Sequence, residues 1–420
     1  MREFDKHTFF ILLFLSFGLC FFAINTSPLW EPLESVYKET TSNSFPPLYY
    51  GLLTFIQKIE MLPDITLRAP SAIAVALTSF SLYLFCTKIF DQQVGWWSCI
   101  ILLTTAIGIF VAKITFALPV YVFFLTFVIF SYLRKQYWLM YFFMFLGVMT
   151  VGICGLIFPL AIIVIHCILI NRIEKLENIH LILGTLLILG VTSPWFFIKY
   201  SQYGNIFLEE VFSCQHLVPL YIDVAKNHSC FYYFVPFLIA IFPWTGTFPS
   251  AFFASFGDSR NEDFENLSIM HIWWIGGFLF LMIYPLKFFT MLWLIAPPLS
   301  VILGWNFYRL EKIVNEHNVF QQTRTYVWGS LITFLAMAFS WFILGKLNME
   351  LEFSGIVIVL ITLMIYVVAI ICLFQFKDIH FYLMLHAGAG MMNLVFFYIF
   401  FFPVIVEQLN LKNYLSKIIG

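Results

Sequence analysis

A short polar stretch, residues 27–39, carries residue types that could do acid–base chemistry. It reads SPLWEPLESVYKE and contains three carboxylates, Glu31, Glu34 and Glu39. Glu31 and Glu34 are three residues apart, a spacing that places two side chains on one face of a helix. Two carboxylates this close can share a proton, which suits a group that takes a proton from a reacting hydroxyl.

A second interpretation of the same stretch needs no chemistry. Its aromatic and apolar residues share the other face of the helix, as in helices that lie on a membrane surface. Glu31 and Glu34 would then be solvated charges near the surface, with Glu34 paired to Lys38. A similar apolar pattern predicts a second surface helix that begins at Pro46 and Pro47.

The elements that position this stretch are membrane-spanning helices. Of 420 residues, 61% are hydrophobic and 11% are charged, and the mean hydropathy is +0.91. A soluble domain carries about 25% charged residues. Apolar runs of about 20 residues cross a bilayer as helices. The fold class is therefore an all-α polytopic membrane protein, and the net charge of −1 gives no sign of a nucleic-acid partner.

We predict a multispanning domain over residues 1–405, with about 13 spans, and a short tail over 406–420. Arg2 and Lys6 precede a first span without a small-residue cleavage site, which is typical of a signal anchor. A modest bias of Lys and Arg predicts a cytoplasmic N-terminus and an outer C-terminus. The long loops 26–68 and 200–230 then lie outside. The predicted spans are 8–25, 69–90, 94–112, 115–133, 137–152, 153–170, 180–199, 231–254, 268–284, 288–308, 325–345, 354–374 and 380–405.

Two cysteines and two histidines in the second long loop form a separate candidate site. The pattern is Cys214-x-His216 followed by His228-x-Cys230. We favour a disulfide between Cys214 and Cys230, because an oxidising compartment pairs cysteines. Free thiols and a Cys/His metal site are the alternatives. The other six cysteines fall within spans and are expected to pack as small apolar residues. No cofactor motif is present, and a requirement for a divalent metal stays open.

Several stretches, in order, resemble the GT-C class of membrane glycosyltransferases. The similarity is greatest to the bacterial aminoarabinose transferases that modify lipid A, and extends to their relatives, the protein O-mannosyltransferases. It covers most of residues 8–308. Besides the polar stretch, it rests on LRAPSA at 67–72, SPWF at 193–196, FLEE at 207–210, NH at 227–228 leading to YY at 232–233, PW at 243–244, and KFFT at 287–290 leading to PP at 297–298.

The resemblance implies a glycosyltransferase in the bacterial inner (plasma) membrane. It would move a sugar from a polyprenyl-phosphate donor to a lipid A-type or protein acceptor at the outer face, with membrane lipid around it. The catalytic residue would be Glu34, assisted by Glu31. Lys287 would bind the donor phosphate. The full set of substrate-binding residues would be Tyr37, Lys287, Thr290 and His228.

The chain departs from the family pattern at several polar positions. Leucine accepts no proton and phenylalanine binds no phosphate, so these departures remove acid–base and phosphate-binding groups. They favour an alternative function, that of a catalytically inactive paralogue that binds lipid or takes part in membrane assembly. The usual catalytic Asp corresponds to Leu33, an Arg to Val36, the Lys of Lys-Pro-Pro to Phe45, a second acid to Leu118, and a Lys-Gly pair to Cys154-Gly155.

Overall fold

The computed structural model describes most of the chain, and every regular element that it describes is helical. Five of the described helices are long and apolar enough to cross a membrane: Ile65–Ile89, Leu181–Tyr203, Phe264–Ile283, Phe289–Lys312 and Ile379–Ile399. The all-α membrane bundle is therefore confirmed. The described residues are 6–28, 34, 46–58, 63–172, 174, 179–205, 207, 211, 230–256, 263–284, 287–316, 327–328, 331, 335, 352–376, 379–403 and 406.

Most predicted spans correspond to single helices. The pair 137–152 and 153–170 is two helices despite a minimal loop, because Gly152 has a φ of 74°, a left-handed conformation that glycine adopts without steric cost. Most of the predicted span 325–345 lies outside the described residues, so the total of about 13 stays a prediction. The single helices are α1 (Lys6–Phe21), α4 (Pro63–Ile89), α7 (Leu118–Leu133), α8 (Tyr137–Val151), α9 (Cys154–Leu169), α11 (Leu181–Tyr203), α15 (Phe264–Ile283) and α18 (Glu352–Phe376).

The other described spans are divided, which the sequence analysis did not predict. Residues 94–112 form α5 (Gln92–Thr104) and α6 (Ala106–Val111), because Thr105 is extended and its hydroxyl caps α6 by accepting from Gly108 N. Residues 231–254 are interrupted at Pro243, which has a fixed φ and no N–H. The remaining pieces are η3 (Cys230–Tyr233), α13 (Phe234–Ala240), η4 (Trp244–Gly246), α14 (Phe248–Phe256), η5 (Phe289–Ile295), α16 (Ala296–Glu316), α19 (Ile379–Phe396) and η7 (Phe397–Phe401).

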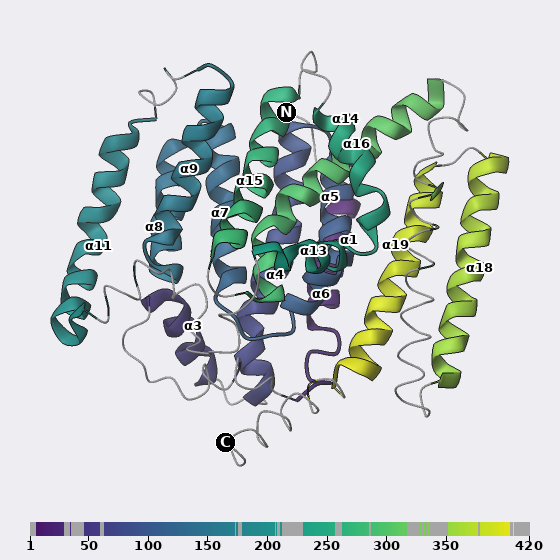
Figure 1. Cartoon of the computed structure of the whole chain (residues 1–420), viewed down its shortest axis with the longest axis horizontal. Coiled ribbons are helices and arrows are strands. Elements are labelled where there is room, and N and C mark those ends of the chain that lie inside the picture. The colour runs from purple at the N-terminus through teal and green to yellow at the C-terminus, as the bar shows by residue number, and fades with distance from the viewer. Residues whose placement is uncertain are drawn as a thin grey trace.

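One surface helix of the first long loop is confirmed at its start. It is α3 (Pro47–Gln57), with Pro47 in the first turn, where its missing N–H costs nothing. In Figure 1, α3 lies at the end of the bundle opposite to the start of α1. We call this end the α3 end; in the predicted topology it is the outer end. The other predicted surface helix, 29–39, lies outside the described residues except for Glu34.

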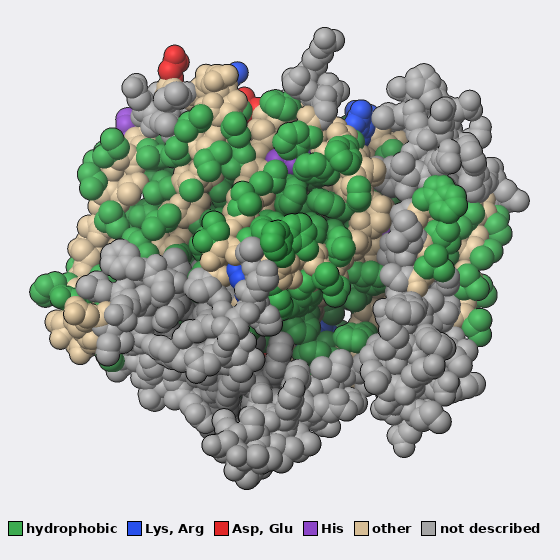
Figure 2. Space-filling view, in the orientation of Figure 1, with side chains coloured by type: hydrophobic (Ala, Val, Ile, Leu, Met, Phe, Trp, Pro, Cys, Tyr) green, Lys and Arg blue, Asp and Glu red, His purple; other side chains and the backbone are tan. Residues whose placement is uncertain are grey.

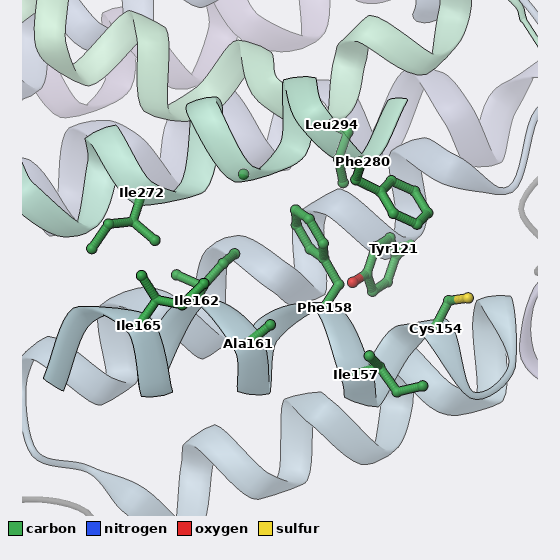
Figure 3. A pocket seen from close by; sticks show the side chains of 11 residues that line it. Tyr121, Cys154, Ile157, Phe158, Ala161, Ile162, Ile165, Ile272, Phe280 and Leu294 are labelled. Carbon is green, nitrogen blue, oxygen red and sulfur yellow. The ribbon is translucent and has the colours of Figure 1, made fainter. Parts of the chain in front are cut away.

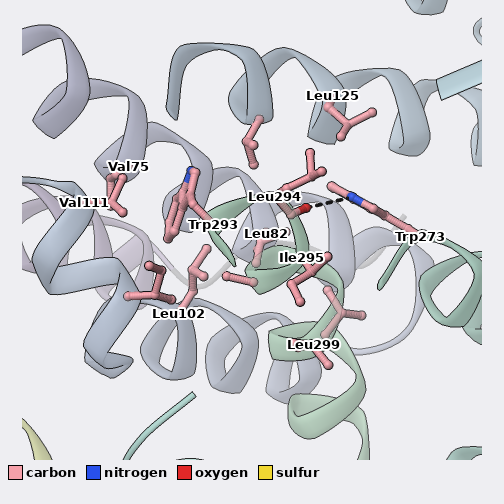
Figure 4. Close-up of a cluster of buried hydrophobic side chains, with 14 of the residues drawn as sticks. Val75, Leu82, Leu102, Val111, Leu125, Trp273, Trp293, Leu294, Ile295 and Leu299 are labelled. Atoms are coloured by element: carbon pink, nitrogen blue, oxygen red, sulfur yellow. Dashed lines mark hydrogen bonds between the residues drawn. The ribbon is translucent and has the colours of Figure 1, made fainter. Parts of the chain in front are cut away.

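The centre of the bundle encloses η5, a 3-10 segment (Figure 4). Non-α backbone inside a membrane protein needs internal hydrogen-bond partners. Trp273 supplies one, because its Nε1 donates to the Leu294 carbonyl over 3.0 Å. Around these groups the packing is apolar and fully buried. Figure 2 shows hydrophobic side chains over the middle of the bundle, with acidic and basic ones along its upper edge, as expected for a protein that crosses a membrane.

Candidate functional site

Arg68, near the start of α4, is the centre of a polar cluster at the α3 end. Its guanidinium is buried and donates to the carbonyls of Ile24, Ser27 and Pro28 over 2.9–3.1 Å and to the Ser27 hydroxyl over 3.3 Å. It also binds Glu34 in a bidentate pair, Nε to Oε1 at 2.9 Å and Nη2 to Oε2 at 2.7 Å. The planar guanidinium suits this geometry. Arg68 therefore joins α4 to the chain that follows α1.

Glu34 is fully buried, so the expectation that it lies near the surface is wrong. Its Oε1 also accepts from the backbone N of Thr115 at 2.9 Å and from the Thr115 hydroxyl at 3.1 Å. The physical reason for the burial is its described partner: a carboxylate leaves water when a cation and further donors replace the lost hydration. That partner is Arg68, which belongs to the LRAPSA motif.

This geometry bears on the catalytic role predicted for Glu34. Both oxygens of Glu34 already accept hydrogen bonds, from the Arg68 guanidinium and from Thr115, so neither oxygen points to an open position where an acceptor hydroxyl would lie. The geometry favours a positioning role, in which Glu34 fixes the polar stretch against α4 and against the connection between α6 and α7. The catalytic role stays an untested prediction.

Lys113 lies two residues before Thr115 in the same connection, and it is buried. Its Nζ donates to the Phe22 carbonyl and lies 4.3 Å from the centre of the Tyr398 ring. The Tyr398 hydroxyl lies 3.1 Å from the Ser27 hydroxyl, which completes a ring of contacts back to Arg68. We call Ser27, Glu34, Arg68, Lys113, Thr115 and Tyr398 the α3-end cluster.

Lys287 and Thr290, both predicted to bind substrate, are described and buried. The Lys287 ammonium donates to the carbonyls of Leu281 and Met282 over 2.7 Å, and to that of Tyr284. It thus satisfies carbonyls at the C-terminal end of α15, a place that favours a cation. The Thr290 hydroxyl has no partner among the described residues. Neither binding role is tested by these contacts.

Other predicted site residues fall outside the described residues. These are Glu31, Tyr37, Cys214 and His228, and only the backbone of Cys230 is described, so the predicted disulfide is untested. In the described chain, no group of three or more His, Cys, Asp or Glu side chains could hold a metal ion. Among the span cysteines, Cys20, Cys86, Cys99 and Cys167 are buried free thiols, as predicted. Cys154 differs, because it is disulfide-bonded.

An apolar groove of about 250 Å³ lies between α7, α9 and α15 and ends at η5 (Figure 3). It opens at the side of the bundle, since Ile157 and Ile165 are 57% and 44% exposed. Its polar side chain is Tyr121, which is buried and whose hydroxyl has no partner in the described part of the chain. The lining is Tyr121, Cys154, Ile157, Phe158, Ala161, Ile162, Ile165, Ile272, Gly276, Phe280 and Leu294.

No functional role was predicted from the sequence for Ser27, Arg68, Lys113, Thr115, Tyr398 or Tyr121. Arg68 was visible as part of a motif. Lys113 was visible as a charge among apolar residues. The remaining contacts depend on pairing distant segments, such as Ser27 with Tyr398. No local pattern in the sequence indicates that pairing.

The comparisons with known proteins agree with this architecture. No family model matches the chain. An uncharacterized protein of Aquifex aeolicus (strain VF5) is 23% identical over 334 residues, which cover 73% of this chain; the match spans 65% of the relative's length. The crystal structure of ArnT from Cupriavidus metallidurans bound to undecaprenyl phosphate has a TM-score of 0.73 at 15% identity, covering 92% of this chain and 75% of that one.

The same ArnT in the apo state has a TM-score of 0.72 at 16% identity, covering 93% of this chain and 76% of that one. The TM-scores establish that the two proteins share a fold. Sequence identities this low leave the activity open. The chain therefore has a membrane-bundle fold similar to that of ArnT, which agrees with the GT-C-type fold expected from the sequence.

Proposed function

We propose that this protein is a glycosyltransferase that takes its sugar from a polyprenyl-phosphate donor. The acceptor would be a lipid A-type or protein molecule at the α3 end, on the outer face of the inner membrane. The observation that carries the proposal is the apolar groove, which opens sideways to the membrane in a GT-C-type bundle. Support comes from the ArnT structure of the same fold, which holds undecaprenyl phosphate.

The groove alone does not select a polyprenyl chain, because lipid tails are equally apolar and no hydrophobic driving force separates them in a bilayer. Selection must come from the phosphate and the sugar. In the proposal, Tyr121 and the polar groups at the α3 end supply these contacts. Lys287, Thr290, Tyr37 and His228 keep their proposed substrate-binding roles.

The base that deprotonates the acceptor needs a carboxylate that is free to take a proton. Of the described carboxylate side chains, only Glu34 is at the α3 end, and Arg68 occupies it. We therefore assign Glu31, the other predicted carboxylate, as the base, and Glu34 as the group that positions the stretch carrying it.

Transfer assays on the protein in lipid nanodiscs test this assignment. The donors are radiolabelled polyprenyl-phosphate sugars, and the acceptors are lipid A and a peptide. Glu31→Gln should lose about 10²–10⁴-fold in transfer rate. Glu34→Gln should lower stability as well. Full activity in Glu31→Gln would overturn the assignment of the base.

The groove is tested separately through Gly276, which lines it and where an added Cβ would meet nothing within 4 Å. Gly276→Leu should fill the groove and weaken binding of undecaprenyl phosphate. Gly190→Leu is the matched control, because Gly190 on α11 is equally open and does not line the groove. Equal binding by both variants would exclude this groove as the lipid site.

A second candidate function is the catalytically inactive paralogue. One observation favours it: Leu118, which stands where the family has its second acid, is the buried first residue of α7 and offers no proton acceptor. This candidate predicts lipid binding without transfer in the wild type. Transfer that appears only in Leu33→Asp would support it, whereas transfer by the wild type would exclude it.

A further inference from the structure

Lys113 is buried, and among the described residues its positive charge has no counter-charge. An ammonium group has three N–H donors. One of them reaches the Phe22 carbonyl, and the ring of Tyr398 faces the charge at 4.3 Å. In the described part of the chain, Lys113 forms no ion pair with a carboxylate. Burying an unpaired charge in a membrane protein costs free energy. Charged residues that are kept in such places are therefore candidates for a functional role.

The neighbouring charges in the α3-end cluster are already matched. Glu34 contributes one negative charge and Arg68 one positive charge, and their bidentate pair uses both. Glu34 also accepts hydrogen bonds from the backbone N–H and the hydroxyl of Thr115. The cluster as described therefore has a net charge of +1, and that charge is on Lys113.

Two separate parts of the described chain hold Lys113. The connection between α6 and α7 and the segment after α1 hold the lysine from one side, and Tyr398 of η7 lies on the other. Figure 2 shows a hollow on this face between α6 and the lower part of α19. A ligand that arrives along the membrane could enter by such a hollow.

We propose that Lys113 binds the phosphate of the lipid-linked donor at the α3 end. This inference rests on the proposed function and names a residue of its ligand site. Phosphate oxygens accept charge-assisted hydrogen bonds from the two donors of Lys113 that the described residues leave open. The Tyr398 ring would keep the ammonium in place by a cation–π contact. A free phosphate ion offers the same chemistry, so the test must separate the two sources.

The test uses the full-length protein in neutral phosphatidylcholine nanodiscs. Undecaprenyl phosphate, undecaprenol and inorganic phosphate are titrated separately, and the thermal midpoint is followed, because a ligand that binds the folded state raises it. For the wild type we expect stabilisation by undecaprenyl phosphate and little effect of the other two. Lys113→Met should bind undecaprenyl phosphate about 10- to 100-fold more weakly, as expected for the loss of a charge-assisted hydrogen bond.

Two controls keep the result interpretable. Lys58→Met removes an exposed lysine at the end of α3 and should leave the affinity unchanged, which excludes a general effect of surface charge. Without ligand, Lys113→Met should be as stable as the wild type or more stable, because it removes a buried unpaired charge. If Lys113→Met does not fold, Lys113→Arg, which keeps the charge, must retain binding.

Each result decides something. Equal affinity of Lys113→Met and the wild type for undecaprenyl phosphate would overturn the role of Lys113 and leave the proposed lipid-dependent function standing. Equal binding of undecaprenol and undecaprenyl phosphate would support the groove and overturn the phosphate site. Lys113-dependent binding of inorganic phosphate at similar concentration would establish a phosphate site and reject the lipid as its selective source. No binding of any polyprenyl compound by the wild type would reject the proposed function itself.

Discussion

The two ends of the bundle each bury a glutamate, but they hold it in different ways. At the α3 end, Glu34 pairs with Arg68, and Arg68 also binds three backbone carbonyls. At the opposite end, Glu311 of α16 is 8% exposed; it accepts from Trp97 Nε1 at 3.0 Å and lies 2.9 Å from Nδ1 of His380. His380 is half exposed.

The two contacts differ in whether the partner of the glutamate always carries a charge. Arginine is always charged, so the Glu34–Arg68 pair persists across the physiological pH range. Histidine is charged only when protonated, so the contact of Glu311 with His380 is an ion pair only in the protonated form. The permanent pair stands beside the candidate site, where groups must be held in place. The adjustable one joins α16 to α19 at the far end.

The strongest test of this contrast is Arg68→Met. It removes the hydrogen bonds that Arg68 donates to the carbonyls of Ile24, Ser27 and Pro28. It also leaves Glu34 buried without its cation. Breaking a buried pair from one side costs about 3–5 kcal/mol of unfolding free energy. The measurement is the unfolding free energy in mixed micelles. Arg309→Met is the control, because the half-buried Arg309 donates to one carbonyl, that of Ala254. Similar losses in both variants would contradict the central role of Arg68.

The next test compares the same substitution at both ends. Glu34→Gln should lose about 1.5–3 kcal/mol, the range of a hydrogen bond to a charged group, because the amide cannot accept both donors of Arg68. Glu311→Gln should lose only about 0.5–1.5 kcal/mol, because its amide oxygen can still accept from Trp97. Chemical denaturation of both variants in one lipid mixture gives the two values. The reverse order would remove the distinction between the ends.

A pH titration adds a third test. Lys113 lies in the connection between α6 and α7, outside the helices, and burial lowers its pKa from 10.5 to about 8. Between about pH 8 and the unfolded pKa, the unfolded chain binds more protons, so stability should rise with pH relative to Lys113→Met. The affinity for undecaprenyl phosphate should fall about tenfold per pH unit over the same pH range, because the deprotonated lysine carries no charge. If stability and affinity changed in the same direction over this pH range, the charge assigned to Lys113 would be contradicted.

The smallest expected effect is that of Tyr398→Phe. It removes the hydroxyl that lies 3.1 Å from the Ser27 hydroxyl and keeps the ring over Lys113. The loss should be about 0.5–1.5 kcal/mol, one neutral hydrogen bond. Binding of undecaprenyl phosphate should persist in this variant and weaken in Tyr398→Leu, which lacks the ring. Equal affinity of the two variants would exclude a cation–π contribution.

The sequence was sufficient to predict the spanning helices, because apolar length and sparse charge follow directly from the bilayer. The breaks at Thr105 and Pro243 were missed because neither residue interrupts the apolar run. The candidate site was predicted less well. Glu34 was found from its motif, but its burial depends on Arg68 from another helix. Lys113 and Tyr398 come together only through tertiary packing, which no local period encodes.

The contact between Ser27 and Tyr398 joins residues that are 371 positions apart. Because the chain is synthesised from its N-terminus, this contact can form only after most of the chain has been made. A chain still on the ribosome, with α1 to α18 made, would hold Glu34 on Arg68 but would lack the Tyr398 ring beside Lys113. Closure of the α3-end cluster would wait for the last described helices. Premature termination before residue 398 would then yield a protein that inserts into the membrane and lacks a complete α3-end cluster.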